Sequence, residues 1–276
     1  MELSICSWTF GEEPIEKVAK FVKDTGYDAV ELHASLAVNN PHYINQLTKE
    51  LDLKISGLTG DAGWPDENKD LANRNPVNRK NAIEYFKRQI EAVNNVNGRY
   101  LVVCPSAVGK SAPMGNGKED WGWAVDSIHQ LTEKASELDV KLIIEPLNRY
   151  ESCIVNSADD AYRFVNEINH PLVKTLLDTY HMNIEEKDMV EPFRRICEMV
   201  EVVHVADNNR QALGRGQLPF QHIFSELQSL KYNRTIVVEC NTPGANPFSA
   251  DKGRDNMQWM YKYAEESLVY LKRWFQ

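Results

Sequence analysis

The sequence has no apolar run approaching the roughly 20 residues needed to cross a bilayer, so a membrane protein is not expected. Its first residues carry no basic leader and no cleavage pattern, which predicts a cytoplasmic protein. An excess of positive charge is also lacking. The 31 Lys and Arg residues face 40 Asp and Glu residues, and this net charge of −9 argues against a protein that neutralises nucleic acid.

Two short motifs are absent as well. The five cysteines are scattered, odd in number and without a C-x-x-C pair, which predicts buried free thiols in a reducing compartment. No G-x-G-x-x-G follows a strand signal, which argues against the dinucleotide site of an open doubly wound sheet.

The sequence instead alternates between short apolar runs and amphipathic stretches along its whole length. Strand signals are LSICSW, AVELH, KISGLTG, RYLVVCP, KLIIEPL, VKTLLDTY, EVVHVAD and TIVVECN. Continuous apolar runs are typical of parallel strands buried on both faces, and the stretches between them have the three- and four-residue spacing of helices that cover a sheet. Eight such units predict one (β/α)8 TIM barrel domain over residues 1–276.

Four candidate metal ligands stand at equivalent positions of four successive units. Glu145, Asp178, His204 and Glu239 each close a strand signal, and the gaps between them are 33, 26 and 35 residues. Since the carboxyl ends of parallel strands meet at one end of a barrel, the four side chains are expected to converge. Three carboxylates and one imidazole suit Mn²⁺, Mg²⁺ or Co²⁺ better than a structural Zn²⁺.

Three polar residues follow these ligands at short offsets. Glu151 comes six residues after Glu145, His181 three after Asp178, and Arg210 six after His204. Such residues would lie in the loops above a metal ion, where a polyhydroxylated ligand would bind.

At these residues the sequence resembles the D-tagatose 3-epimerase and D-allulose (psicose) 3-epimerase family of xylose-isomerase-like TIM barrels. The resemblance is carried by IIEPLNRYESCIVNSA, LLDTYHMNIEE, HVADNNRQALGRGQLPF and VVEC, and is strongest from residue 121 to residue 240. It departs after Glu239, where Cys240 to Gly244 replace the Pro and aromatic residue usual in the family, and in the third-strand loop with Trp64. These departures leave the identity of the sugar open.

The resemblance implies a metal-dependent ketose 3-epimerase. Glu145, Asp178, His204 and Glu239 would hold one divalent ion, commonly Mn²⁺, and Glu145 and Glu239 would act as the acid and base that invert C3 through an enediolate. Glu151, His181 and Arg210 would grip oxygens at the carbonyl end of the sugar, and Trp121 would lie near it. Barrels of this group commonly associate, so a homodimer or homotetramer is expected.

Several alternatives stay open at this point. One is an aldose–ketose isomerase acting on hydroxypyruvate or an inosose, which moves hydrogen between C1 and C2. Another is an epimerase of a phosphorylated pentulose, for which Gly214, Arg215 and Gly216 could offer phosphate contacts. A DNA-repair endonuclease of the same fold would need more histidines at strand ends and a basic face, and a sugar-binding module would not need paired carboxylates.

Overall fold

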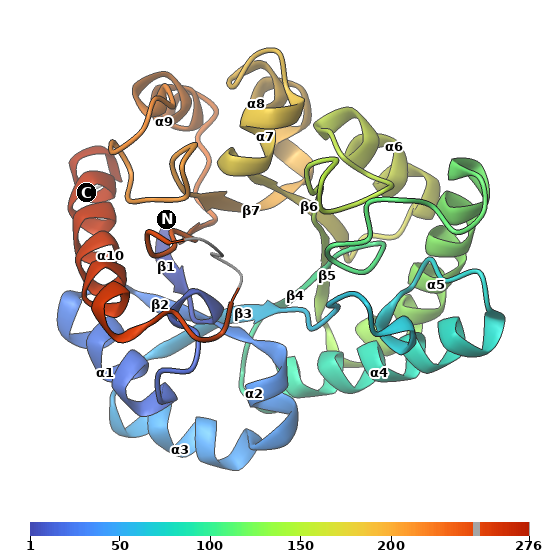
Figure 1. Ribbon diagram of the computed structural model, residues 1–276, viewed down its shortest axis with the longest axis horizontal. Helices are drawn as coiled ribbons and strands as arrows, with labels where there is room; N and C mark the ends of the chain where they lie inside the picture. The colour runs from blue at the N-terminus through green and yellow to red at the C-terminus, as the bar shows by residue number, and fades with distance from the viewer. Residues whose placement is uncertain (245–248, 276) are drawn as a thin grey trace.

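The computed structural model describes residues 1–244 and 249–275, and its central feature is a closed barrel of eight parallel strands (Figure 1). Each strand pairs with its neighbours in chain order, and β1 also pairs with β8. The predicted (β/α)8 fold is therefore confirmed. The strands are β1 Glu2–Cys6, β2 Ala29–His33, β3 Lys54–Thr59, β4 Tyr100–Val103, β5 Lys141–Ile144, β6 Val173–Asp178, β7 Val200–Val205 and β8 Thr235–Val238.

Helices surround the barrel on the outside (Figure 1). They are α1 Ile15–Thr25, α2 Ala34–Asn39, α3 Pro41–Glu50, α4 Pro76–Asn95, α5 Gly117–Leu138, α6 Ala158–Ile168, α7 Thr179–Glu185, α8 Glu191–Ile196, α9 Phe220–Ser229 and α10 Arg254–Phe275, with short 3-10 turns η1 Trp8–Phe10, η2 Glu67–Lys69 and η3 Cys197–Met199. In the part of the chain that the structure describes, none of these helices is long and apolar enough to span a membrane.

Two helices begin earlier than their apolar periodicity predicts. The apolar spacing of α4 and α5 starts at residues 82 and 123, whereas the helices begin at residues 76 and 117. The extra turns are polar and start at capping residues: the Asn75 side chain accepts a hydrogen bond from the Val77 N–H, and Asn116 forms a capping box with Glu119.

The strands are buried on both faces, as their continuous apolar runs predict. A small apolar cluster fills the barrel interior, and a larger one lies between the strands and the helices. The interior cluster consists of Cys6, Tyr100, Val102, Ile143, Leu176, Val202 and Val237. Because it plugs the barrel, any ligand cavity must lie at one end of the strands.

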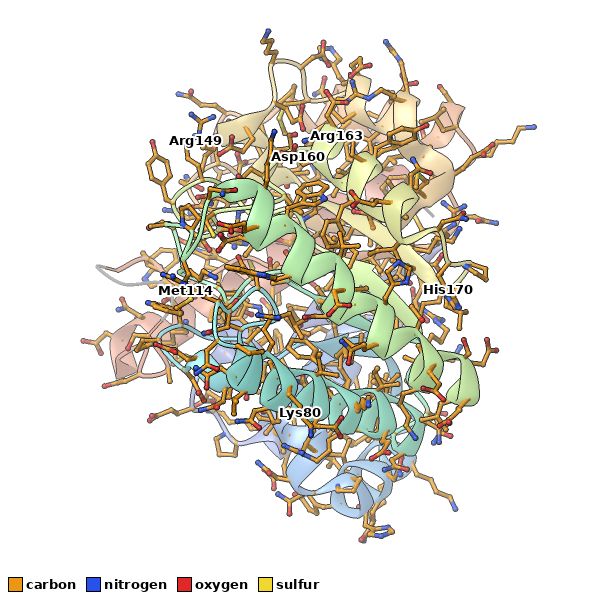
Figure 2. All side chains as sticks on the ribbon, turned by 90° about the vertical axis from the view of Figure 1, so that its right-hand side faces the viewer. Lys80, Met114, Arg149, Asp160, Arg163 and His170 are labelled. Carbon is orange, nitrogen blue, oxygen red and sulfur yellow. The ribbon has the colours of Figure 1, made fainter. Side chains whose placement is uncertain are left out.

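The two ends of the barrel differ, as a side view shows (Figure 2). Met114 and Arg149, in loops that follow β4 and β5, lie at one end, while His170, which precedes β6, lies at the opposite end. The carboxyl ends of the strands and their long loops therefore share one end of the molecule.

The loops after β3, β4 and β5 are joined to one another above the barrel. Isolated parallel bridges link Gly63 with Val108 and Lys110 with Ser152, and the Gly109 N–H donates to the Glu151 carbonyl at 2.7 Å. These backbone contacts align three loops side by side, so they form one continuous wall.

Lys110 fixes this wall from within. Its ammonium lies 2.7 Å from an Asp70 carboxylate oxygen and 3.5 Å from one of Asp120, and all three side chains are at most 2% exposed. The buried cation thereby ties the loop after β3 to the start of α5.

We expect Lys110→Met to destabilise the fold by about 3–5 kcal/mol, because it leaves two buried carboxylates without their cation. Urea denaturation measures this loss. Lys118→Met, at the exposed second residue of α5, is the matched control and should change the free energy of unfolding by less than about 0.5 kcal/mol.

Candidate metal centre and substrate cavity

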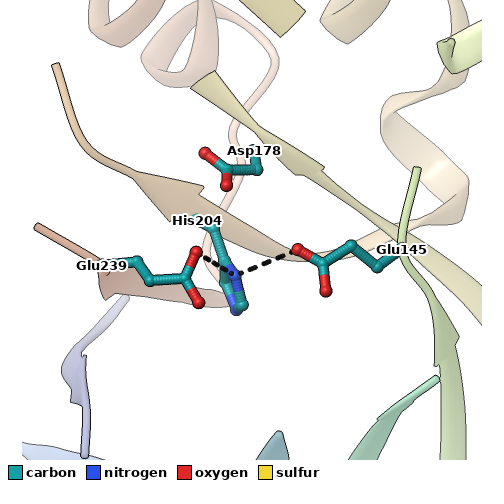
Figure 3. A group of neighbouring side chains, drawn as sticks. All are labelled: Glu145, Asp178, His204 and Glu239. Carbon is teal, nitrogen blue, oxygen red and sulfur yellow. Dashed lines mark ion pairs between the residues drawn. The ribbon is translucent and has the colours of Figure 1, made fainter. Parts of the chain in front are cut away.

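Four side chains from four adjacent strands converge at the carboxyl end of the barrel (Figure 3). Asp178 is the last residue of β6 and His204 lies near the end of β7, while Glu145 and Glu239 directly follow β5 and β8. One ligand atom from each residue lies within 4.8 Å of the others, and the four residues are at most 5% exposed. The regular spacing in the sequence thus becomes one compact cluster.

The His204 ring is held in one orientation. Its Nε2 lies 3.3 Å from a carboxylate oxygen of Glu31, which is fully buried. Its Nδ1 lies 3.4 Å from Glu239 and 3.7 Å from Glu145, yet makes no hydrogen bond to any described residue. Burial would lower the pKa of His204, but Glu31 and Glu239 raise it well above its usual range. Because Glu31 accepts the Nε2 proton, Nδ1 is the nitrogen that faces the space between the carboxylates, and it would ligate a metal on giving up its own proton.

Glu31 lies in the middle of β2 and was not among the sequence candidates. Both of its oxygens are already held, since the Thr59 and Tyr100 hydroxyls each donate at 2.7 Å. One sequence signal could have identified Glu31: it is an acidic residue inside the apolar run AVELH. A carboxylate in a buried strand needs a buried partner, so this position points to a polar contact.

We expect Glu31→Gln to weaken divalent-metal binding about 10- to 100-fold, because the neutral amide no longer fixes and polarises the His204 ring. Titration of the metal-free protein with Mn²⁺ measures this change. Glu185→Gln, which alters a carboxylate paired with Arg149, should leave the metal affinity unchanged. Equal affinities for Glu31→Gln and the parent chain would contradict the assignment.

The cluster carries more negative charge than its own cations balance. Burial, with Glu239 and Asp178 nearby, raises the pKa of Glu145 well above its usual range, although His204 opposes the shift. Burial also raises the pKa of Asp178 to about 7 against the effect of Arg210. For Glu239, burial would raise the pKa, but His204, Arg210 and the Trp8 indole N–H lower it well below its usual range.

These observations fit a divalent cation. A bound cation would offset the burial and the carboxylate repulsion that raise the Glu145 pKa, and it would accept the Nδ1 lone pair of the neutral His204 ring. Three carboxylates and one imidazole are a donor set for Mn²⁺, Mg²⁺ or Co²⁺. The buried group could therefore hold a metal ion.

Arg210 lies beside the cluster. Its guanidinium Nη1 is 2.9 Å from Glu239 and 3.3 Å from Asp178, and the group stacks 4.2 Å above the Tyr180 ring. The Arg210 backbone has a φ of 59°, and its carbonyl accepts a hydrogen bond from the Asn241 N–H. A planar cation is thus fixed at the edge of the cavity next to Glu239.

Asn148, which was also not predicted, holds two of the predicted residues. Its side-chain amide donates to Glu151 at 2.8 Å and lies 2.8 Å from His181 Nδ1, which also accepts from the Asn148 backbone N–H at 3.1 Å. Because Nδ1 is the acceptor, the ring proton is on Nε2, 3.4 Å from Asp178. His181 and Glu151 are thereby set as neighbouring donor and acceptor.

The cluster opens into a cavity of about 220 Å³. Residues from both sides of the barrel line it, and these are Trp8, His33, Thr59, Gly60, Asp61, Ala62, Gly63, Cys104, Val108, Glu145, Leu147, Glu151, His181, Arg210 and Glu239. The predicted residues Glu151, His181 and Arg210 are therefore brought together with Glu145 and Glu239.

Trp121 is not brought to this cavity. It lies in the first turns of α5, where its indole N–H donates to Glu167 at 2.8 Å and its ring packs edge-on against Phe164. Both contacts are with α6, so the side chain joins two outer helices and does not line the cavity.

The turn formed by Gly214, Arg215 and Gly216, in the loop after β7, stabilises the protein's own structure. The Gly214 and Gly216 N–H groups donate to one Asp207 carboxylate oxygen at 2.9 and 2.8 Å, and Arg215 pairs with Glu266. A side chain at Gly216 would collide with Asp207, since its Cβ would lie 2.3 Å from that carboxylate. These groups are engaged within the protein, which removes the basis for a phosphate site here.

Comparison with known proteins agrees with the geometry. The family model of the xylose isomerase-like TIM barrel matches residues 19–263. The 3-dehydro-D-guloside 4-epimerase of Escherichia coli (strain K12) is 29% identical over 94% of this chain and 99% of its own. The D-psicose 3-epimerase of Ruminiclostridium cellulolyticum is 30% identical over 82% of this chain and 76% of its own.

A solved structure supports the fold. The D-psicose 3-epimerase of Clostridium cellulolyticum H10, in a structure with D-tagatose, has a TM-score of 0.88 at 24% identity and covers the whole of both chains. Fold and site together are those of an isomerase built on a TIM barrel. The chain belongs to the xylose isomerase-like TIM barrel family, among relatives that are sugar epimerases, and the expected enzyme class is confirmed.

Proposed function

We propose that this protein is a metal-dependent ketose 3-epimerase that inverts C3 of an unphosphorylated ketose. One observation carries the proposal: Glu145 and Glu239 lie close together but come from separate strands. Their ligand atoms lie within 4.8 Å of each other, while the residues follow β5 and β8, which have two strands between them. Two carboxylates that approach one carbon from different sides are what inversion requires.

The reaction begins at a C–H bond next to a ketone, which is a very weak acid. One glutamate removes the C3 proton, and the other returns a proton to the opposite face. A divalent ion held by Glu145, Asp178, His204 and Glu239, most suitably Mn²⁺, would supply a Lewis acid for the negative charge that develops on the carbonyl oxygen.

The remaining residues position the substrate. Arg210 and His181 donate hydrogen bonds to oxygens at the carbonyl end, and Glu151 accepts one from a hydroxyl. The buried walls on either side exclude water from the reacting carbon. We further propose that the substrate is a sugar and that the chain folds as a single domain. The protein would act in the cytoplasm as a homodimer or homotetramer.

Exchange in D₂O tests this function. The protein is stripped of metal, reloaded with Mn²⁺ and incubated with D-tagatose, D-fructose, D-allulose and L-ribulose, and products are followed by NMR. We expect deuterium at C3 and the C3 epimer. Label at C1 or C2 with an aldose product would instead indicate an aldose–ketose isomerase.

A second candidate is an epimerase of a keto-glycoside. It is favoured by the Escherichia coli relative, a 3-dehydro-D-guloside 4-epimerase that this chain covers over 99% of its length. The chemistry is the same, because C4 is the neighbour of a ketone at C3. Deuterium at C4 of a 3-keto-glucoside, with no exchange in free ketoses, would favour this candidate.

A further inference from the structure

The cavity has a second polar side, which neither the metal cluster nor the reaction uses. His33 ends β2 and Asp61 follows β3, whereas Asp178 and His204 lie on β6 and β7. In a closed barrel of eight strands in chain order, β2 faces β6 and β3 faces β7. His33 and Asp61 therefore line the same cavity as Glu145 and Glu239, from strands across the barrel from Asp178 and His204.

Asp61 is held in place from three directions. Its backbone N–H donates to the Gln89 side-chain oxygen at 2.8 Å, and the fully buried Gln89 amide donates back to its carbonyl. Its carboxylate oxygen Oδ2 accepts from Lys69 at 2.7 Å and from Tyr85 at 2.5 Å. Such support is typical of a preorganised binding group.

One acceptor atom of Asp61 and one ring atom of His33 remain available. Among the described residues, Asp61 Oδ1 accepts no hydrogen bond, and His33 uses Nδ1 for the Ser35 hydroxyl at 2.7 Å but leaves Nε2 without a partner. Burial lowers the pKa of His33, so the ring is neutral at pH 7. Burial would raise the pKa of Asp61, but Lys69 and Tyr85 lower it, so the carboxylate is charged.

We propose that His33 and Asp61 bind hydroxyl groups on the substrate carbons beyond C4, and so select a ketose whose distal carbons carry free hydroxyls. A carboxylate accepts hydrogen bonds from hydroxyls and repels phosphate, and the nearby Lys69 cation is already paired with it. The inference rests on the proposed ketose 3-epimerase activity.

The test compares two substrates of different length. D-Tagatose has six carbons, while D-erythrulose keeps C1 to C3 but ends at C4. We expect Asp61→Asn and His33→Ala each to lower kcat/KM for D-tagatose about 10- to 100-fold, the range for a hydrogen bond to a charged or buried group, mainly through KM. For D-erythrulose, each should change kcat/KM less than about 3-fold.

Asp66→Asn is the matched control, because Asp66 is an exposed carboxylate of the same loop that does not line the cavity. Asp66→Asn should leave kcat/KM unchanged for both D-tagatose and D-erythrulose. Equal losses on both substrates, no loss on D-tagatose, or faster turnover of a ketose 6-phosphate than of the free ketose would overturn the inference. If the parent chain exchanges C3 in neither sugar, the proposed function itself fails, and this outcome is distinct from the others.

Discussion

Replacing Glu239 by glutamine is expected to lower the rate of C3 inversion about 10³-fold, because an amide cannot take up or return the proton while it keeps an oxygen in the same place. Glu145→Gln should give a loss of the same order. Each variant retains one carboxylate, so each should still exchange the C3 proton of one epimer with solvent and form little of the other. Polarimetry measures inversion, and NMR in D₂O measures exchange.

Glu266→Gln is the matched control for both variants, since its carboxylate pairs with Arg215 at the surface and lies outside the cavity. Metal content is measured on every variant, and rates are taken at saturating Mn²⁺, which separates lost proton transfer from lost metal. Inversion by either variant within about 10-fold of the parent chain would show that its glutamate is not the acid or base.

Removal of the metal should have an effect of similar size. We expect chelation to lower turnover about 10³-fold, because the carbonyl oxygen then loses the charge that stabilises the developing anion. The melting temperature should fall as well, since Glu145, Asp178 and Glu239 then face one another without the metal, beside His204 and Arg210. At 100 times the dissociation constant, a ligand that binds only the folded state contributes about 2.7 kcal/mol.

Reloading with Mn²⁺ should restore both turnover and melting temperature, and reloading with Mg²⁺ or Co²⁺ shows which ion supports the reaction. Calorimetry and metal analysis on the same samples provide the measurement. Unchanged turnover in protein shown to be free of metal would remove the metal from the mechanism.

The barrel and the convergence of the four cluster residues could be predicted because both depend on period and register. Each strand signal ends with one polar residue, and parallel strands carry such residues to the same end. Glu31 does not follow this rule, because it lies in the middle of AVELH; its partner His204 is 173 residues away, and no local pattern connects the two.

Other contacts could not be predicted because they depend on helix starts and on loop geometry. Trp121 was expected near the sugar because the family that the sequence resembles keeps a tryptophan there, but in α5, which begins at Gly117, its indole N–H donates to Glu167 on α6. Asn148 stands in a loop without periodicity, so its contacts with Glu151 and His181 follow only from the folded chain.

The joined loops after β3, β4 and β5 bear on how this enzyme can change its preference for sugars. Because Gly63 is bridged to Val108 and Lys110 to Ser152, a length change in one loop shifts the backbone of the others, including the Glu151 carbonyl. This side of the cavity is therefore one structural unit. Evolution or engineering of a new specificity here requires exchange of the three loops together, whereas point substitutions such as those at His33 and Asp61 adjust recognition without moving the wall.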